Sequence, residues 1–175
     1  MKGEKISVMY SEEQVDERIR ELAAQINEDL NGEAVKLVCI LKGASFFACE
    51  LAKRLTVPVY MDFMYVSSYG NGTESSGNVR ITKDLESPIE GENVLIVEDI
   101  IDSGRTLSCL SDEFRKRGAK KVMICTLLSK PDRREVEVPV DYIGYVIPDR
   151  FVVGYGLDYA QKYRNLPYIG AVEFA

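Results

Sequence analysis

The segment from residue 94 to residue 107 constrains the fold of this chain most. It reads Val-Leu-Ile-Val-Glu-Asp-Ile-Ile-Asp-Ser-Gly-Arg-Thr-Leu. Four consecutive apolar residues without polar alternation are typical of a parallel strand that is buried on both faces. Leu107, Leu110 and Phe114 then mark one face of a helix. The segment therefore predicts an α/β fold with an open, mostly parallel central sheet and flanking helices.

The polar turn of this segment predicts an anion site at the start of the helix. Free N–H groups at a helix N-terminus form a phosphate cradle together with the hydroxyls of Ser103 and Thr106 and with Gly104, which lets backbone approach closely. Glu98 and Asp99 would repel a phosphate, so they need a partner that donates hydrogen bonds or carries positive charge, such as a sugar diol or Mg²⁺. A ribose 5-phosphate satisfies both halves of this site.

The run from Glu98 to Thr106 resembles the phosphoribosyl pyrophosphate motif of type I phosphoribosyltransferases, in the version typical of hypoxanthine-guanine phosphoribosyltransferases. Residues 147–159 and the tripeptide Arg164-Asn165-Leu166 resemble the same enzymes, so the likeness covers nearly the whole chain. It implies purine salvage: the Mg²⁺-dependent transfer of a 5-phosphoribosyl group from phosphoribosyl pyrophosphate to hypoxanthine or guanine. The products would be IMP or GMP and pyrophosphate.

The composition bounds the class of protein. The 175 residues fit one domain, and 46% hydrophobic with 29% charged residues is typical of a globular protein. No apolar run approaches the length of a membrane span, and a formal net charge of −6 argues against a dedicated nucleic-acid binder. The first residues lack a secretory apolar core. Four cysteines without Cys-x-x-Cys spacing are interpreted as reduced core residues, which predicts a cytoplasmic location: Cys39, Cys49, Cys109 and Cys125.

The chain contains no histidine. Imidazole bases and His metal sites are therefore excluded, and carboxylates must carry out any proton transfer and hold any metal. Oxygen ligands favour magnesium over zinc.

Further strands and helices surround the central segment. A capping box at Ser11 to Gln14 and an apolar face predict a helix that ends at Asn31-Gly32. Apolar runs predict strands at residues 35–41, 57–67, 79–81 and 122–128. Because ligands bind beyond the carboxyl ends of parallel strands, we expect four side chains to converge on one rim: Lys42, Glu98, Asp102 and Lys130.

Residues 70–78 contain three glycines and no apolar side chain. An ordinary hairpin loop and a flap that closes over substrate both fit this composition. The resemblance implies a flap at about residues 68–79, in which Ser68 and Tyr69 touch the substrate. At the other end of the chain, residues 142–175 do not continue the strand-helix alternation, so we expect them to form a small hood beside the main sheet.

The resemblance also implies a role for individual residues. Asp102, Ser103, Gly104, Arg105 and Thr106 would surround the 5-phosphate, with Asp102 also the acid/base at purine N7. Lys42 and Gly43 would form the pyrophosphate loop, which has a cis peptide before the lysine in these enzymes, and Arg164 would also meet the pyrophosphate. Glu98 and Asp99 would face the ribose hydroxyls and would help to hold magnesium. Asp158 would lie beside the purine and would also help to hold magnesium. Lys130 would donate to the 6-oxo oxygen, Phe151 would stack on the base and Val152 would contact its edge through the main chain. Ala44-Ser45 departs from the Gly-Tyr that relatives often have.

Two other classes of protein share parts of this pattern. A receiver-type signalling domain also places paired acids and a lysine at strand ends, but it does not need Ser-Gly-Arg-Thr at the start of a helix. An RNA-binding transcriptional regulator on the same fold is the more serious alternative, because a fold does not fix a function. Lys130 and Phe151 favour the enzyme, which we expect to form a homodimer or homotetramer.

Overall fold

A computed structural model of the chain describes residues 3–68 and 79–174, and its strands form two sheets. In spatial order, the larger sheet contains β4 (Val79–Lys83), β3 (Val59–Ser68), β2 (Val35–Leu41), β5 (Asn93–Ile101), β6 (Lys121–Ser129) and β7 (Tyr142–Val146). The smaller sheet contains β1 (Lys5–Tyr10), β9 (Ile169–Glu173) and β8 (Val152–Val153). The helices are α1 (Glu12–Leu30), α2 (Ser45–Ala52), α3 (Arg105–Lys116) and the short 3-10 helix η1 (Pro131–Arg133).

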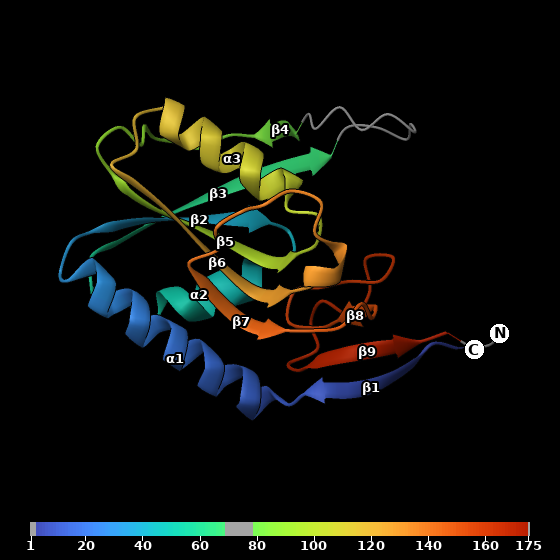
Figure 1. Cartoon of the computed structure of the whole chain (residues 1–175). Helices are drawn as coiled ribbons and strands as arrows, with labels where there is room; N and C mark the ends of the chain where they lie inside the picture. Colours follow the sequence, from blue (N-terminus) through green and yellow to red (C-terminus); the bar gives the residue numbers. More distant parts are fainter. Residues whose placement is uncertain (1–2, 69–78, 175) are drawn as a thin grey trace.

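The expected open, mostly parallel sheet is confirmed. Strands β3, β2, β5, β6 and β7 are parallel, and only the edge strand β4 of this sheet runs antiparallel. Helices α1 and α2 cover one face and α3 covers the other (Figure 1). Since both faces are covered, the apolar residues of the central strand β5 from Val94 to Val97 are fully buried.

Helix α1 has the boundaries that its sequence predicts. The Ser11 side chain accepts a hydrogen bond from the Gln14 N–H, and the Gln14 side chain accepts one from the Ser11 N–H. The helix ends at Asn31, which is left-handed with φ 47°. Its buried face packs on the sheet and consists of Val15, Ile19, Leu22, Ala23, Ile26 and Leu30.

The expectation that residues 142–175 form a separate hood is wrong for β7. This strand pairs in parallel with β6 and extends the main sheet. Residues 130–141 make the crossover between the two strands without an α-helix, so the sequence there shows no strand-helix alternation. The hood consists of β8 and β9 with β1, an N-terminal strand that the sequence patterns did not reveal. We use "hood" for these three strands and the loop between β8 and β9.

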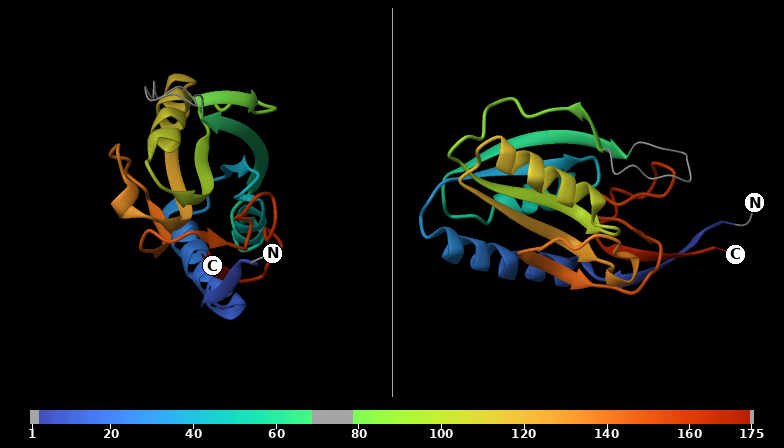
Figure 2. Two further views of the ribbon diagram at one scale, coloured as in Figure 1. Left: turned by 90° about the vertical axis from the view of Figure 1, so that its right-hand side faces the viewer. Right: turned by 45° about the horizontal axis from the view of Figure 1, so that its top comes forward.

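The parallel strands all point toward one end of the molecule, where the hood and both chain termini lie (Figure 2). No helix among the described residues is long and apolar enough to cross a membrane. The four cysteines are free. Cys39 and Cys125 are buried as expected, but Cys49 is exposed and Cys109 only partly buried, because each lies on the outer side of a helix rather than in a strand.

Candidate active site at the carboxyl edge of the sheet

Three of the expected site residues follow directly after neighbouring strands. Lys42 follows β2, Asp102 follows β5 and Lys130 follows β6. These strands are adjacent and parallel, so the three residues lie along one edge of the sheet. Glu98 and Asp99 belong to the last part of β5.

The turn after β5 forms a hollow at the start of α3. Gly104 precedes the helix with φ 83° and has no side chain that could cap it, while the Arg105 N–H at the helix start donates to Ser103 Oγ at 3.3 Å. A Cβ atom at Gly104 would lie 2.8 Å from the Val136 carbonyl oxygen, so this tight turn requires glycine. The hollow has a volume of ≈ 240 Å³, and its lining is Glu98, Ile100, Ile101, Asp102, Ser103, Gly104, Thr106 and Leu107.

The segment after η1 supports this turn from outside. The Ser103 carbonyl oxygen accepts hydrogen bonds from the N–H groups of Glu135 (2.9 Å) and Val136 (3.1 Å). Arg134 Nε donates to the Asp102 carbonyl oxygen at 3.0 Å. The side chain of Arg105 pairs with Glu135 at 2.6 Å, so it is held at the outer side of the turn. The backbone of the turn is therefore fixed while the Asp102 side chain stays exposed.

Glu98 and Asp99 form a pair of neighbouring carboxyl groups whose ionised form is disfavoured by burial. Both keep some contact with solvent, but burial raises the pKa of Glu98 well above its usual range, and the neighbouring charges of Asp99 and Asp102 raise it further. Burial also raises the pKa of Asp99. Each carboxylate accepts a hydrogen bond from the next residue of the strand: the Asp99 N–H donates to Glu98 Oε1 (3.1 Å) and the Ile100 N–H to Asp99 Oδ1 (2.8 Å). Such a pair suits a cation or a group with several hydroxyl donors.

The loop after β2 lies tightly against both the carboxylates and the hood. The peptide bond between Leu41 and Lys42 is cis, as the resemblance implies. A Cβ atom at Gly43 would overlap the Asp99 carboxylate, and one at Gly156, which has φ 98°, would overlap the Gly43 carbonyl oxygen. The hood therefore rests on the Lys42-Gly43 backbone through glycine at both positions.

The hood contributes a cationic corner beside this loop. Arg164 Nη1 donates to the Gly156 carbonyl oxygen at 2.7 Å, and Arg164 Nη2 lies 3.2 Å from Asp158 Oδ1. The other oxygen of Asp158 accepts from the Gln161 N–H at 2.7 Å. The positive charge of Arg164 lowers the pKa of Asp99, against the larger effect of burial, so the two residues sense each other's charge.

Aromatic and cationic side chains lie next to the end of β6. Lys130 has a side chain only 9% exposed, and its Nζ lies 3.7 Å from Asp149 Oδ1. Phe151 is 44% exposed and packs edge-on against Tyr159 and Phe174, with ring centroids 5.6 and 5.7 Å away. Val152 is buried in β8. A planar apolar ligand could stack on Phe151 with its polar edge toward Lys130.

Two expectations, the flap and the three magnesium ligands, are not confirmed by the described residues. Ser68 pairs with Val79 at the end of β3, whereas Tyr69 and the rest of the expected flap to residue 78 lie outside the described residues. Within the described part of the chain, no three acidic or thiol side chains gather as a ready cage for a metal ion. Glu98 and Asp99 thus form a pair, with Asp158 on the separate hood.

Three residues with contacts in this region were missed by the sequence analysis as site residues. Gly156 packs on Gly43, Asp149 pairs with Lys130, and Gln161 contacts both Lys42 and Arg164. Their only sequence signal is the position of Gly156 and Asp149 within the family-like run 147–159, which does not reveal contacts to distant segments.

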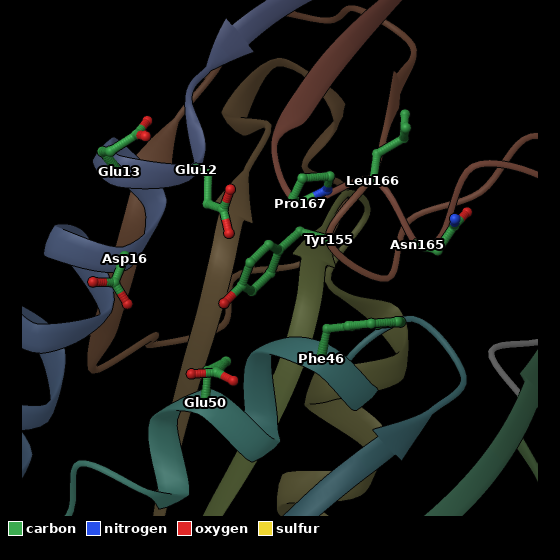
Figure 3. Close-up of a pocket in the computed structure, with 9 residues that line it drawn as sticks. All are labelled: Glu12, Glu13, Asp16, Phe46, Glu50, Tyr155, Asn165, Leu166 and Pro167. Atoms are coloured by element: carbon green, nitrogen blue, oxygen red, sulfur yellow. The ribbon is translucent and has the colours of Figure 1, made fainter.

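A second hollow of ≈ 410 Å³ lies behind the loop after β2 (Figure 3). Figure 3 shows side chains from α1, α2 and the hood around it. Its lining is Glu12, Glu13, Asp16, Phe46, Glu50, Tyr155, Asn165, Leu166 and Pro167. Four carboxylates make this hollow unsuitable for a phosphate.

The comparison with protein families decides the assignment. The model of the phosphoribosyl transferase domain matches residues 9–160. This chain belongs to the phosphoribosyl transferase family.

Individual phosphoribosyl transferases agree with this assignment over the full length of the chain. The chain is 49% identical over 173 residues to the hypoxanthine-guanine phosphoribosyltransferase of Bacillus subtilis, covering 99% of this chain and 96% of that protein. A crystal structure of a hypoxanthine-guanine phosphoribosyltransferase from Bacillus anthracis, with HEPES in its active site, matches with a TM-score of 0.93 and 48% identity over 97% of this chain and 100% of that chain.

Other relatives are longer. The bifunctional protein TilS/HprT of Listeria monocytogenes is 54% identical over 166 residues, which cover 95% of this chain but 26% of that protein. The chain thus spans about a quarter of the length of these bifunctional relatives.

Proposed function

We propose that this protein transfers the 5-phosphoribosyl group of phosphoribosyl pyrophosphate to a 6-oxopurine, giving IMP or GMP and pyrophosphate. The observation that carries this proposal is the hollow after β5, where the start of α3 and the Glu98-Asp99 pair occur together. A phosphate suits the first half and ribose hydroxyls or a cation suit the second. Its relatives named hypoxanthine-guanine phosphoribosyltransferase support the same substrates.

In this proposal, the turn Asp102 to Thr106 binds the 5-phosphate. The backbone N–H groups at the start of α3 and the Ser103 and Thr106 hydroxyls supply donors. The bonds from Glu135, Val136 and Arg134 keep the turn in shape before substrate arrives, which reduces the entropy that ordering it would cost.

Asp102 is proposed as the acid/base at purine N7. It follows β5 at the edge of the hollow, and its side chain is exposed while its carbonyl oxygen is held by Arg134. When the purine nitrogen attacks C1 of the ribose, the bond from C1 to pyrophosphate breaks and the purine loses a proton. A carboxylate at this edge of the site can accept that proton.

Lys42, Gly43 and Arg164 are proposed to bind the pyrophosphate. The two cations offset charge that develops on the leaving group as its bond to C1 breaks. Gly43 and Gly156 allow the loop and the hood to approach closely, so that both cations can reach one ligand.

Glu98 and Asp99 are proposed as the carboxylates that hold Mg²⁺ on this chain, together with Asp158. Burial raises the pKa of both carboxyls, and a bound cation would offset the charge that they carry when ionised. Both oxygens of Asp158 already have partners, so it suits a contact through a metal-bound water. The bound ion would supply charge neutralisation for the pyrophosphate.

The purine is proposed to stack on Phe151, with its 6-oxo oxygen toward Lys130 and its edge against the main chain of Val152. Lys130 can only donate hydrogen bonds, so it distinguishes an oxo group from an amino group. Its nearly buried position makes an unsatisfied donor costly.

We further propose that residues 1–175 act as one domain that works in the cytoplasm as a homodimer or homotetramer. The four free cysteines support a reducing compartment. The exposed apolar side chains of Phe46, Tyr60 and Met61 support burial against another copy.

A panel of bases tests the proposal. Purified protein with phosphoribosyl pyrophosphate and Mg²⁺ should form nucleotide from hypoxanthine or guanine and very little from adenine. Xanthine in the same panel ranks the 6-oxopurines. Tight RNA binding without turnover on any base would contradict the proposal and favour a regulator on this fold.

A further inference from the structure

Gln161 lies in a sharply bent part of the hood loop. Its own φ is 66°, and Ala160 and Tyr163 are also left-handed, with φ 49° and 76°. Tyr159 and Lys162 close the bend by exchanging backbone hydrogen bonds of 3.0 and 2.9 Å. The Gln161 N–H is bound to Asp158 Oδ2 at 2.7 Å. These hydrogen bonds fix the backbone of Gln161 and therefore the position of its Cβ atom.

The Gln161 amide oxygen accepts hydrogen bonds from two cations. Lys42 Nζ donates to it at 3.3 Å and Arg164 Nη2 at 3.2 Å. Lys42 comes from the main sheet and Arg164 from the hood, so this one oxygen links the two parts of the molecule. Lys42 and Arg164 thus share Gln161 as a hydrogen-bond partner.

The neutral Gln161 amide leaves part of the charge of the two cations uncompensated. Its oxygen accepts one hydrogen bond from each cation, and Asp158 Oδ1, 3.2 Å from Arg164 Nη2, offsets the repulsion between them only on the side of Arg164. An anion with several oxygens would satisfy both donors and neutralise the repulsion. Since a neutral acceptor holds the cations less strongly than a carboxylate would, it is also easier to displace.

We propose that Gln161 is a positioning residue of the pyrophosphate site: its amide oxygen holds the Lys42 ammonium and the Arg164 guanidinium together, and an oxygen of pyrophosphate replaces it. This inference rests on the proposed function, because it assigns the pyrophosphate to the side where these two cations meet. It gives Gln161 no part in proton transfer and no contact with the purine.

The experiment measures binding of inorganic pyrophosphate by titration calorimetry, with and without Mg²⁺, to the full chain and three variants. Gln161→Gly removes the amide at a left-handed position where glycine is not strained. Gln161→Glu places a negative charge between the cations. Ala160→Gly is the matched control, because it loosens the neighbouring left-handed residue and keeps the amide. Thermal unfolding of each variant checks the fold.

Gln161→Gly should weaken pyrophosphate binding about three- to tenfold, because Lys42 and Arg164 are then no longer held together beforehand and must be ordered by the ligand. Gln161→Glu should weaken it further, and rising salt should narrow that difference because it screens the added charge. Ala160→Gly should bind as the parent does. In steady-state assays, KM for phosphoribosyl pyrophosphate should rise in Gln161→Gly while KM for hypoxanthine stays unchanged.

Unchanged pyrophosphate binding in Gln161→Gly would overturn the inference, and so would equal weakening in Ala160→Gly, which would assign the effect to the bend. If the parent protein forms nucleotide and Gln161→Gly binds pyrophosphate as the parent does, this inference is wrong and the proposed function stands. If the parent forms no nucleotide but Gln161→Gly still binds pyrophosphate more weakly than the parent, the proposed function is wrong and the role of Gln161 in anion binding stands.

Discussion

The turn after β5 and the loop of the hood build the same site in different ways. The turn from Asp102 to Thr106 lies between a strand and a helix that its own sequence predicts, and residues 134–136 then support it. In the hood, Gly156 rests on Gly43 and Gln161 reaches Lys42, a residue 119 positions away. Local sequence therefore predicts the first region, whereas the second region depends on tertiary contacts that local sequence does not reveal.

The two regions also differ in charge. The sheet edge carries the partly buried Glu98-Asp99 pair, whose pKa values are raised by burial. The hood brings Arg164, with two hydrogen-bond partners already in place. This difference suggests that substitutions in the turn change chemistry and stability, whereas substitutions in the hood change recognition.

The largest expected effect is in the turn. Asp102→Asn should lower turnover about 10²- to 10⁴-fold, the usual contribution of general acid–base catalysis, because the amide cannot accept the proton. Binding of phosphoribosyl pyrophosphate should change only a few-fold, since the turn is held by backbone bonds from residues 134–136. Single-turnover kinetics and calorimetry measure the two quantities. Turnover close to that of the parent would remove Asp102 from the role of base.

The next effect concerns recognition of the base. Lys130→Gln should narrow the ratio of kcat/KM for hypoxanthine over adenine by about 10- to 100-fold, because the new side-chain oxygen can accept from an amino group and the buried ammonium is gone. The ratio is measured for parent and variant with phosphoribosyl pyrophosphate held constant. If it does not change, Lys130 does not contact the base, and main-chain groups near Val152 must exclude adenine.

A pair of glycine variants separates tertiary contact from local strain. Gly156→Ala and Gly32→Ala both place a side chain at positive φ, which costs about 1–2 kcal/mol. Only Gly156 faces another backbone, so its variant should lose about 1–3 kcal/mol more and show a raised KM for phosphoribosyl pyrophosphate. Chemical denaturation and initial rates measure both. Equal losses in the two variants would mean that the hood does not depend on this contact.

The smallest expected effect is on stability at the carboxylate pair. Glu98→Gln should gain about 0.5–2 kcal/mol at pH 7 while losing activity, because it removes a charge that burial disfavours. When folding raises the pKa of a carboxyl, its charge destabilises the folded state fully at pH values above the folded-state pKa. This penalty shrinks as the pH falls and is gone below the pKa of the unfolded chain. The gain should therefore shrink on acidification. Denaturation at several pH values measures it, and a loss at pH 7 would mean that the charge is compensated.

Much of the sheet and its site could be predicted from sequence. The strand of Val94 to Val97, the glycine at position 104 and the capped start of α1 all follow from local patterns and lie where these patterns predict. The placement of β7 in the main sheet could not be predicted, because its crossover contains no α-helix. Gln161 could not be recognised either, since its position depends on three left-handed residues and a distant lysine.

The most direct test of the account is the stoichiometry of product formation. With hypoxanthine, phosphoribosyl pyrophosphate and Mg²⁺, each pyrophosphate released should be matched by one IMP formed, and omission of hypoxanthine should abolish the release. Pyrophosphate release that continues without the base, or that yields no nucleotide, would contradict phosphoribosyl transfer as the function of this site.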